Sequence, residues 1–575
     1  MTDNASTETA RQLAEAIREI TPEAGADAPS ADPVGETAAL LSGAGAPASL
    51  APAAVAALGE SAPRLLREDP WAVLAVPGVQ PANADAFARA LLGGEAGPGD
   101  PRRAAALTVW LLERAALQGH TALELTAVRA GLAEQGVPAP DQALAAVLQE
   151  DGRVMPFQEE DDSFGESVGG DEEDEAAPPR VLLALDRLAL AEDSLADGLI
   201  RLLSTAEPAQ ESWAEGADKH TAPLLEAAAQ SGLVLHTGGE AARSEPVGAV
   251  RAARERGLRA TMAAASASSL SRLGDEQAVL LRELLSSGER DEEGSLALDL
   301  LAVVDAPTLD VETAATLVES LADGTRLILS GDPGELWSTG PGRVFADLLA
   351  AKAAPVVASR QPDFGPIGEL VSGIGIGELQ QVEAPDKEVV LVTARDAAEA
   401  AHRAVQLVTD SIPRALGIPS DQVRVVTHAH AGPAGTRALN AALKARLAPG
   451  PGQFGGFDVG DLVLDGGESA TVTAAGPEGL TLSTGRTVPP AEAASLRHGW
   501  ALTAHQSLSR RWPAVVTVLA PEAVPGLTRQ WVYSAFNRAA THLSVVTAIG
   551  PALPEAVNAR PAAPRTTRLK GLLSQ

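Results

Sequence analysis

Residues 298–304 read LDLLAVV, and residues 232–236 and 326–330 read GLVLH and RLILS. Apolar runs of this length are typical of strands that are buried on both faces of a parallel sheet. Amphipathic stretches lie between them, which favours helices that cover the sheet. The same alternation continues in four later runs: Val389–Thr393, Val423–Thr427, Ala514–Leu519 and Leu543–Ala548. The sequence therefore predicts an α/β fold.

The runs fall into two groups, because the long stretch Ala358–Asp386 separates the first three from the rest. We therefore expect two parallel sheets, one in a domain over residues 180–357 and one in a domain over 358–575. Within the second domain, Phe457–Pro489 consists of short strand-like pieces punctuated by glycine. This pattern predicts a small β-barrel inserted at about residues 455–495.

The chain before residue 180 has a different character. From Thr21 to about Ser49 the chain is rich in Ala, Pro, Gly and acidic residues with few large apolar groups, and we expect residues 1–49 to form a disordered tail. Residues 50–157 show helical periodicity broken by Gly and Pro turns, so we expect an all-helical domain. Between residues 158 and 177 there are ten acidic and no basic residues, and we interpret 158–179 as an acidic linker.

Composition narrows the possible functions. The formal net charge of −32 disfavours contact with phosphate backbones, so any nucleic-acid site has to be local. The chain has no cysteine, which excludes disulfides, thiolate zinc sites and cysteine nucleophiles. No apolar run approaches the roughly 20 residues of a membrane helix. We expect a cytoplasmic protein without a membrane span, and no metal site, because His428 and His430 lack an evident third ligand.

Motifs follow the first three apolar runs. Thr237-Gly238-Gly239 follows GLVLH, Asp305 follows LDLLAVV, and Gly331-Asp332-Pro333-Gly334-Glu335-Leu336 follows RLILS. With the order of segments from about Pro52 to Gly550, these motifs resemble the RecD-like branch of superfamily 1 DNA helicases. The resemblance implies two RecA-like domains with an inserted SH3-like barrel, preceded by a helix-hairpin-helix region around Ala57–Gly93. It also implies ATP with magnesium as cofactor.

The candidate nucleotide site departs from the family pattern in several motifs. Gly238, Gly239 and Ser244 are the candidate nucleotide-binding residues, but Ser244 stands at the lysine position and Glu245 at the magnesium-binding hydroxyl. Glu240 adds a carboxylate that would repel a triphosphate. The candidate catalytic residues are Asp305, Glu335, Arg360 and Arg538. Asp305 stands at the position of the family's catalytic glutamate or, if the alignment is shifted by one residue, at that of its metal ligand. Glu335 replaces the family's glutamine, and Arg360 and Arg538 stand at the two positions of arginines that contact the γ-phosphate.

The resemblance also implies residues that contact DNA. Gly78 keeps one glycine of the hairpin, whereas Gln80 replaces the second, and a purely structural turn is the alternative. In Trp500–Ser509 the family's Thr, His and Ser are retained as Thr503, His505 and Ser507, while its lysine, glutamine and glycine are replaced. Gly78, Thr503, His505 and Ser507 are therefore the candidate DNA-binding residues.

Changes in four separate motifs predict that phosphoryl transfer is lost, because each supplies charge stabilisation that positioning alone cannot replace. We expect a pseudo-helicase that binds single-stranded or junction DNA weakly and salt-sensitively, or a DNA-repair protein. We expect no cofactor, with ATP and magnesium only if the degenerate site still binds them. The alternatives are an active ATP-dependent DNA helicase and a protein interaction scaffold without DNA binding, in which the acidic linker docks a basic partner.

Overall fold

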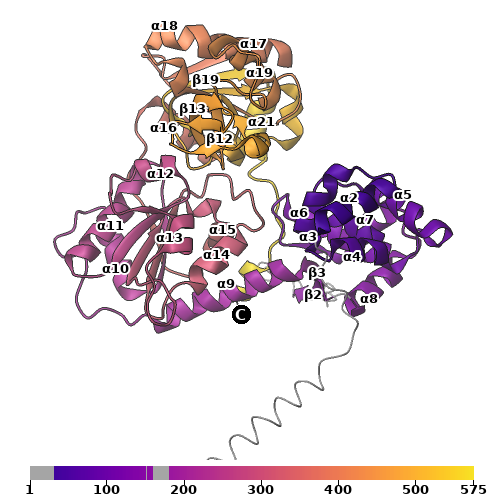
Figure 1. The fold of residues 1–575 in the computed structure, drawn as a ribbon. Coiled ribbons are helices and arrows are strands. Elements are labelled where there is room, and N and C mark those ends of the chain that lie inside the picture. Colours follow the sequence, from indigo (N-terminus) through magenta and orange to yellow (C-terminus); the bar gives the residue numbers. More distant parts are fainter. Residues whose placement is uncertain (1–31, 151, 160–179, 575) are drawn as a thin grey trace, which may run out of the picture. The chain divides into compact units, whose positions relative to one another are not determined.

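A computed structural model describes residues 32–150, 152–159 and 180–574, and the chain divides into two compact units (Figure 1). Unit 1 consists of residues 1–112 and 125–154, and unit 2 of residues 113–124 and 155–575. Residues 1–31 of the predicted tail and residues 160–179 of the predicted linker lie outside the described residues. In the described part of the chain, no helix is long and apolar enough to span a membrane.

Unit 1 is helical, as the sequence predicts. Trp71, in a 3₁₀ segment over Pro70–Ala75, and Phe87 are buried in its core. Asp85 joins Trp71 to the buried Arg103. The Asp85 carboxylate accepts from the Trp71 indole at 2.9 Å and from the buried Arg103 at 2.7 and 2.9 Å. The helices are α2 (Pro33–Gly43), α3 (Ala51–Leu58), α4 (Ala62–Glu68), α5 (Pro81–Leu92), α6 (Pro101–Ala116), α7 (Leu125–Glu134) and α8 (Pro140–Glu150).

The predicted disordered tail over 1–49 is wrong at its C-terminal end, because α2 starts at Pro33. Asp32 caps this helix by accepting from the Gly35 amide at 2.8 Å, and Pro33 occupies its first position. Leu41 is fully buried, so this one large side chain joins the core although the surrounding composition is poor in apolar residues.

The first α/β domain of unit 2 contains a parallel six-stranded sheet in the order β6-β5-β7-β8-β4-β9. The three predicted runs form β4 (Leu233–Thr237), β7 (Leu300–Val303) and β8 (Arg326–Gly331). The sequence analysis missed β5 (Ala260–Ala264), β6 (Val279–Leu280) and β9 (Val356–Ala358). The covering helices include α9 (Asp186–Thr205), α10 (Ala222–Gln230), α11 (Ser244–Glu255), α14 (Val311–Glu319) and α15 (Val344–Ala351).

The second α/β domain contains a parallel five-stranded sheet in the order β10-β19-β18-β11-β17. Its strands are β10 (Val389–Thr393), β11 (Val423–Thr427), β17 (Ala501–Thr503), β18 (Trp512–Leu519) and β19 (Ala539–Thr547). Hydrophobic cores lie on both faces of this sheet, under α16 (Gly365–Gly375), α17 (Ala397–Gln406), α19 (Thr436–Leu447), α20 (Arg529–Phe536) and α21 (Ala552–Ala559). The predicted pair of parallel sheets is confirmed.

The insertion in the second domain is an antiparallel five-stranded sheet in the order β15-β14-β13-β12-β16. It has a core of its own around Phe457, Val463 and Leu480. Its strands are β12 (Leu462–Asp465), β13 (Glu468–Gly476), β14 (Gly479–Leu482), β15 (Thr487–Val488) and β16 (Arg497–His498). An SH3-like barrel stays a prediction for this segment.

A three-stranded sheet corrects two predicted boundaries. Its order is β1-β3-β2, with β1 at Ala122–Glu124, β2 at Val154–Glu159 and β3 at Arg180–Leu185. The segment 50–157 is therefore not all-helical, and the domain predicted to start at 180 begins with a strand outside the six-stranded sheet. Leu182 and Ala184 on β3 pack with Ala122 and Ala189, so this small sheet has its own apolar cluster.

We predict that Asp85→Ala destabilises unit 1 by roughly 3 kcal/mol, because it leaves the buried Arg103 guanidinium without its carboxylate. Hydrogen exchange in increasing urea, read on peptides from residues 70–92 and 101–112, measures this. Asp141→Ala is the control, since the Asp141–Arg129 pair is exposed and 3.6 Å apart and should change stability by less than about 0.5 kcal/mol. Equal effects of the two substitutions would contradict the assigned role of Asp85.

Candidate functional site

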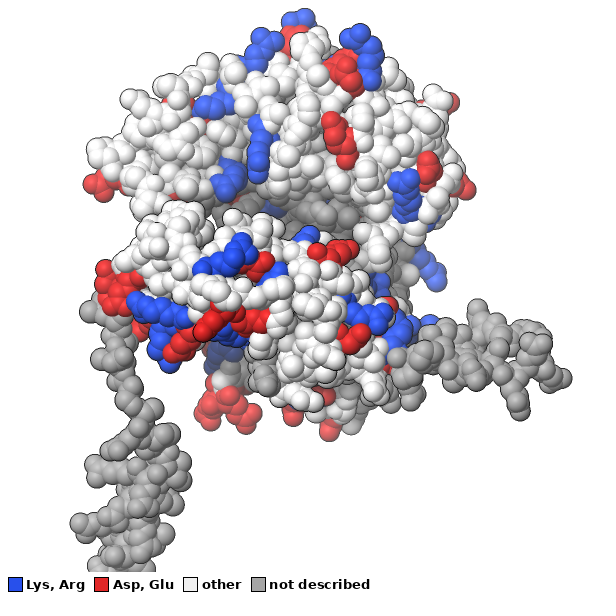
Figure 2. Space-filling view, turned by 90° about the vertical axis from the view of Figure 1, so that its right-hand side faces the viewer, with Lys and Arg blue, Asp and Glu red and all other residues white. Residues whose placement is uncertain are grey.

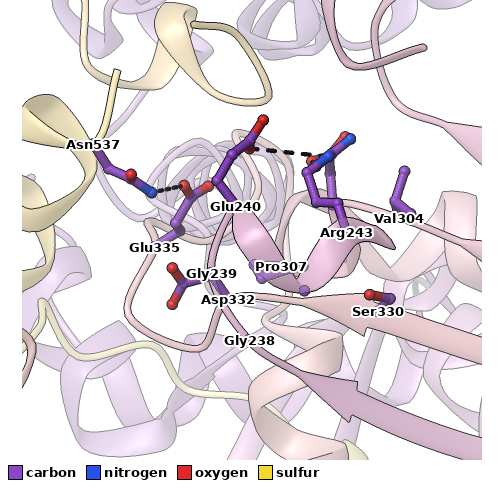
Figure 3. Close-up of a pocket in the computed structure, with 12 residues that line it drawn as sticks. Gly238, Gly239, Glu240, Arg243, Val304, Pro307, Ser330, Asp332, Glu335 and Asn537 are labelled. Carbon is purple, nitrogen blue, oxygen red and sulfur yellow. Dashed lines mark hydrogen bonds and ion pairs between the residues drawn. The ribbon is translucent and has the colours of Figure 1, made fainter. Parts of the chain in front are cut away.

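The candidate site lies where strands β4, β7 and β8 end, which is the edge of a parallel sheet at which ligands commonly bind (Figure 3). Three loops meet there, and Asn537 from the second α/β domain closes the space. The cavity that remains has a volume of about 30 Å³. It is lined by Gly238, Gly239, Glu240, Arg243, Val304, Asp305, Pro307, Ser330, Gly331, Asp332, Glu335 and Asn537.

Arg243 and Asp305 form an ion pair at the centre of this cavity. Arg243 Nη1 donates to Asp305 Oδ1 at 2.7 Å, and Ser269 hydrogen-bonds to both partners. Burial raises the pKa of Asp305, but Arg243 and the Ser269 hydroxyl lower it more, so the pKa lies below its usual value. Asp305 also has a left-handed backbone (φ 60°), which fixes its carboxylate at the start of a 3₁₀ turn over Ala306–Thr308.

Glu240 is surrounded by guanidinium groups. Arg272 Nε donates to it at 2.8 Å, and Arg243 and Arg511 each lie 3.9 Å away. Figure 3 shows Glu240 turned towards Arg243 above the strand ends. The repulsive carboxylate that the sequence predicts is therefore neutralised inside the cleft by basic residues from both α/β domains.

Glu245 is buried and fully engaged. His236 Nε2 lies 2.8 Å from its carboxylate, and Ser359 and Gln361 donate to it at 2.5 and 3.0 Å. Burial lowers the pKa of His236, whose other ring nitrogen lies 2.8 Å from Ser330 Oγ. Ser244 begins α11 and is exposed, and it is not among the residues that line the cavity. Neither Ser244 nor Glu245 lines the cavity.

The Asp363 carboxylate binds backbone amides of the loop that follows β4. Its carboxylate accepts from the Ala241 amide at 2.7 Å and from the Glu240 amide at 3.2 Å. A Cβ built on Gly239 would lie 2.1 Å from the Asp363 carboxylate, so glycine is what allows this approach. Sequence reasoning missed Asp363, which lies 122 residues from Ala241 and three residues after the candidate Arg360.

Glu335 lines the cavity and also binds the second α/β domain. The buried Arg538 forms an ion pair with its carboxylate, and Asn537 donates to it at 2.9 Å, as Figure 3 shows. Beside it, Tyr533 donates to Asp332 at 2.6 Å. Burial and the Glu335 charge raise the pKa of Asp332 to about 7. Glu335 and Arg538 thus meet, as their predicted site roles require, but they neutralise each other.

Of the remaining nucleotide-site candidates, two line the cavity and one does not. Gly238 and Gly239 line the cavity, and nucleotide binding by them stays a prediction. Arg360 is exposed and is not a lining residue, so the structure does not bring it to the other candidates. Its neighbours Ser359 and Gln361 supply the contacts to Glu245 instead.

Three DNA-binding candidates are turned into the protein. Ser507 is fully buried and donates to the Ala504 carbonyl at 2.7 Å, and Thr503 accepts from the Gln506 amide at 3.2 Å. Burial and the nearby Arg565 lower the pKa of His505 to about 4. The hydroxyls of Thr503 and Ser507 are thus engaged by neighbouring backbone groups, and DNA binding by these residues stays a prediction.

Gly78, the fourth DNA-binding candidate, lies in unit 1 between the 3₁₀ segment and α5. It has φ +89°, and a Cβ built on it would contact nothing within 4 Å, so its surroundings are open. Gln80 caps α5 with its backbone, and its side chain donates to the Gly78 carbonyl at 3.4 Å. The hairpin is accessible, but Gln80 lies across it.

No group of three or more His, Asp or Glu side chains suited to a metal ion occurs among the residues that the structure describes. His428 and His430 serve other contacts. His428 lies against Trp531, with ring centroids 5.7 Å apart, and His430 Nδ1 lies 2.9 Å from the Thr436 hydroxyl.

Comparison with known proteins finds similarity in both units. A family model described as the HHH domain of ATP-dependent RecD2 DNA helicases matches residues 31–122. The chain is 29% identical over 488 residues to the ATP-dependent RecD2 DNA helicase of Deinococcus radiodurans, which covers 76% of this chain and 65% of that relative. It is 28% identical over 539 residues to the RecBCD enzyme subunit RecD of Mycobacterium tuberculosis, which covers 78% of this chain and 88% of that relative.

Among solved structures, the Pif1 helicase from Bacteroides in complex with ADP-AlF3 and ssDNA has a TM-score of 0.34 and 12% identity, covering 56% of this chain and 89% of that one. The chain spans less than two thirds of the Deinococcus relative, at 65% of its length.

We predict that Arg243→Ala inverts the pH dependence of stability at this site. In the native chain the Asp305 pKa is below its unfolded value of 3.8, so its stabilising contribution is present above that pH and is lost as pH falls. Without Arg243, burial raises the pKa, and stability should increase as pH falls from about 7 to about 5. At neutral pH we expect a loss of roughly 3 kcal/mol.

Unfolding temperatures at several pH values measure this effect. Arg243→Ala with Asp305→Asn removes the buried charge and should recover most of the stability at neutral pH. Arg259→Ala is the matched control, because the Arg259–Asp299 pair is exposed. If Arg243→Ala lost stability on acidification as the native chain does, the ion pair would not be what keeps Asp305 charged.

Proposed function

We propose that this RecD-like superfamily 1 helicase homologue, which has an N-terminal helix-hairpin-helix domain, is a pseudo-helicase: a DNA-binding protein of repair that does not hydrolyse ATP. The homology supports a nucleic-acid role. The contacts within the cleft support the loss of catalysis.

The observation that carries the proposal is the ion pair between Arg243 and Asp305. Phosphoryl transfer needs positive charge that is free to stabilise the transferring group, and a carboxylate that is free to order a metal or polarise water. Here the two candidate groups neutralise each other at 2.7 Å, and Ser269 holds both. Glu335 and Arg538 form a second such pair.

The residues present do not fit ATP with magnesium. Glu245, at the hydroxyl position, is held by His236, Ser359 and Gln361. Asp363 takes two of the loop amides that would otherwise receive a phosphate. The cavity, at about 30 Å³, is small in this arrangement, with room for two or three water molecules at roughly 10–15 Å³ each. We therefore assign no catalytic step to this site.

Charge supports weak rather than tight DNA binding. In residues 32–112 and 125–154 acidic residues outnumber arginines and there is no lysine. On the face drawn in Figure 2, described acidic and basic side chains are interspersed, without an extended basic surface. Neutralisation of phosphates dominates DNA affinity, so a hairpin around Gly78 with few cations should bind single-stranded or junction DNA weakly.

The rival function is a working helicase, which the similarity to the Deinococcus RecD2 helicase and the retained Gly238 and Gly239 favour. Calorimetry with ATP and magnesium, and phosphate release with and without a single-stranded oligonucleotide, decide between the two. We expect no binding heat and no release above a blank. Release that Asp305→Asn abolishes would establish a working ATPase and overturn the proposal.

We predict that a labelled single-stranded oligonucleotide binds at low salt and dissociates as salt rises from about 50 to about 200 mM, with a shallower slope than a protein that makes six or more phosphate contacts. Fluorescence anisotropy measures this. Gln80→Gly removes the side chain that lies across Gly78 and should tighten binding several-fold. If no anisotropy change occurred even at low salt, a protein interaction scaffold would replace DNA binding as the function.

A further inference from the structure

Residues 560–574 leave the second α/β domain and end on the first (Figure 1, yellow). The segment is anchored at its start within the second domain. Arg560 donates to the Val524 carbonyl at 2.9 Å and pairs with Glu555 at 2.7 Å. The carbonyls of Arg560 and Pro561 accept from the first two amides of α20 at 2.7 and 3.0 Å.

Arg565 is the first contact of this segment with the first α/β domain. Its guanidinium donates to the carbonyls of Gly342 at 2.6 Å and Ser338 at 2.8 Å, and it lies 5.5 Å from the centre of the Trp337 ring. A Cβ on Gly119 would lie 2.1 Å from Arg565 Nε, so a larger residue at position 119 would displace the guanidinium. These partners lie on the loop between β8 and α15 and on the turn before β1.

Thr566 continues the contact through its backbone. Its carbonyl accepts from the Thr121 amide at 3.0 Å, and its amide donates to His120 Nδ1 at 3.0 Å. Burial lowers the pKa of His120, which keeps the ring neutral and able to accept at neutral pH.

Arg568 and the final helix α22 (Leu569–Ser574) complete the attachment. Arg568 is buried, donates to Asp193 at 2.8 Å and to the Ala189 carbonyl at 3.3 Å, and lies 3.3 Å from the centre of the Phe157 ring. Its amide donates at 2.9 Å to Glu192, whose other partner is the Thr121 hydroxyl. Leu569 is buried, and α22 packs on α9 and α15.

Only residues 562–564 join the two anchored parts, and three extended residues span at most about 10 Å. Opening of the cleft between the α/β domains would have to stretch this short span or break the buried contacts of Arg565 and Arg568. We propose that residues 560–574 are an intramolecular clamp that holds the two α/β domains in one arrangement. The proposal does not depend on whether the nucleotide site is active.

Spin-label distances test the clamp, and the absence of cysteine makes specific labelling direct. Thr316→Cys on α14 and Gln406→Cys on α17 place exposed labels on the first and second α/β domains. Arg565→Ala with Arg568→Ala removes side-chain contacts to the first domain. Arg560→Ala is the matched control, because its side-chain contacts lie within the second domain.

We expect a narrow distance distribution for the labelled parent and for Arg560→Ala, and a distribution at least twice as wide for the Arg565→Ala and Arg568→Ala double variant. Hydrogen exchange at the Thr121 amide should be about tenfold faster in the double variant, because the Thr566 carbonyl no longer protects it. Exchange protection in β4 and β18 reports whether both domains stay folded. Equal widths in the three proteins would overturn the clamp, and Arg568→Ala alone repeats the test if the double variant unfolds.

Discussion

In the cleft between the α/β domains, buried arginines and carboxylates neutralise one another's charge, and the arrangement of the cleft depends on these ion pairs. Arg243, Arg272, Arg511 and Arg538 project into a space that also holds Glu240, Asp305 and Glu335. Removing charges from water is costly unless each finds a partner, and breaking one buried pair leaves the other charge uncompensated. The groups therefore constrain one another as a set. A ligand phosphate would have to compete with carboxylates that are already in place.

The charged groups of the cleft also join the two α/β domains. Glu335 follows β8 of the first domain, whereas Arg538 and Asn537 follow α20 of the second. Tyr533 and Ser534 on α20 bind Asp332 and the Leu336 amide at 2.6 Å each. The positions that the helicase resemblance assigns to sensing a nucleotide thus form interdomain contacts here. Arg538 therefore has a structural role in joining the two α/β domains.

Much of the fold could be predicted from the sequence, because buried parallel strands leave uninterrupted apolar runs such as RLILS at 326–330. The missed strand β5 reads ATMAA: three of its five residues are alanine, which is depleted in strands, and Thr261 is its one β-branched residue. The site was predictable only in part. The altered loop was visible in the sequence, but the contact of Asp363 with the loop joins segments 122 residues apart, and the Ser507 hydroxyl is turned to the Ala504 carbonyl by the local 3₁₀ turn.

The clamp also has a consequence for how the chain reaches its fold. Thr121 and Thr566 meet although 445 residues separate them, and α22 covers helices of a domain whose own strands end near residue 358. At a synthesis rate of about 5–20 residues per second, roughly 20–90 seconds pass between the emergence of these two positions from the ribosome. From α15, which ends at Ala351, to α22, which starts at Leu569, synthesis takes roughly 10–45 seconds at the same rate, and until then the apolar faces of α9 and α15 that α22 later covers stay open to solvent. A segment that is made after both α/β domains therefore completes the surface of the earlier-made one, and chaperone contact should concentrate on that surface until then.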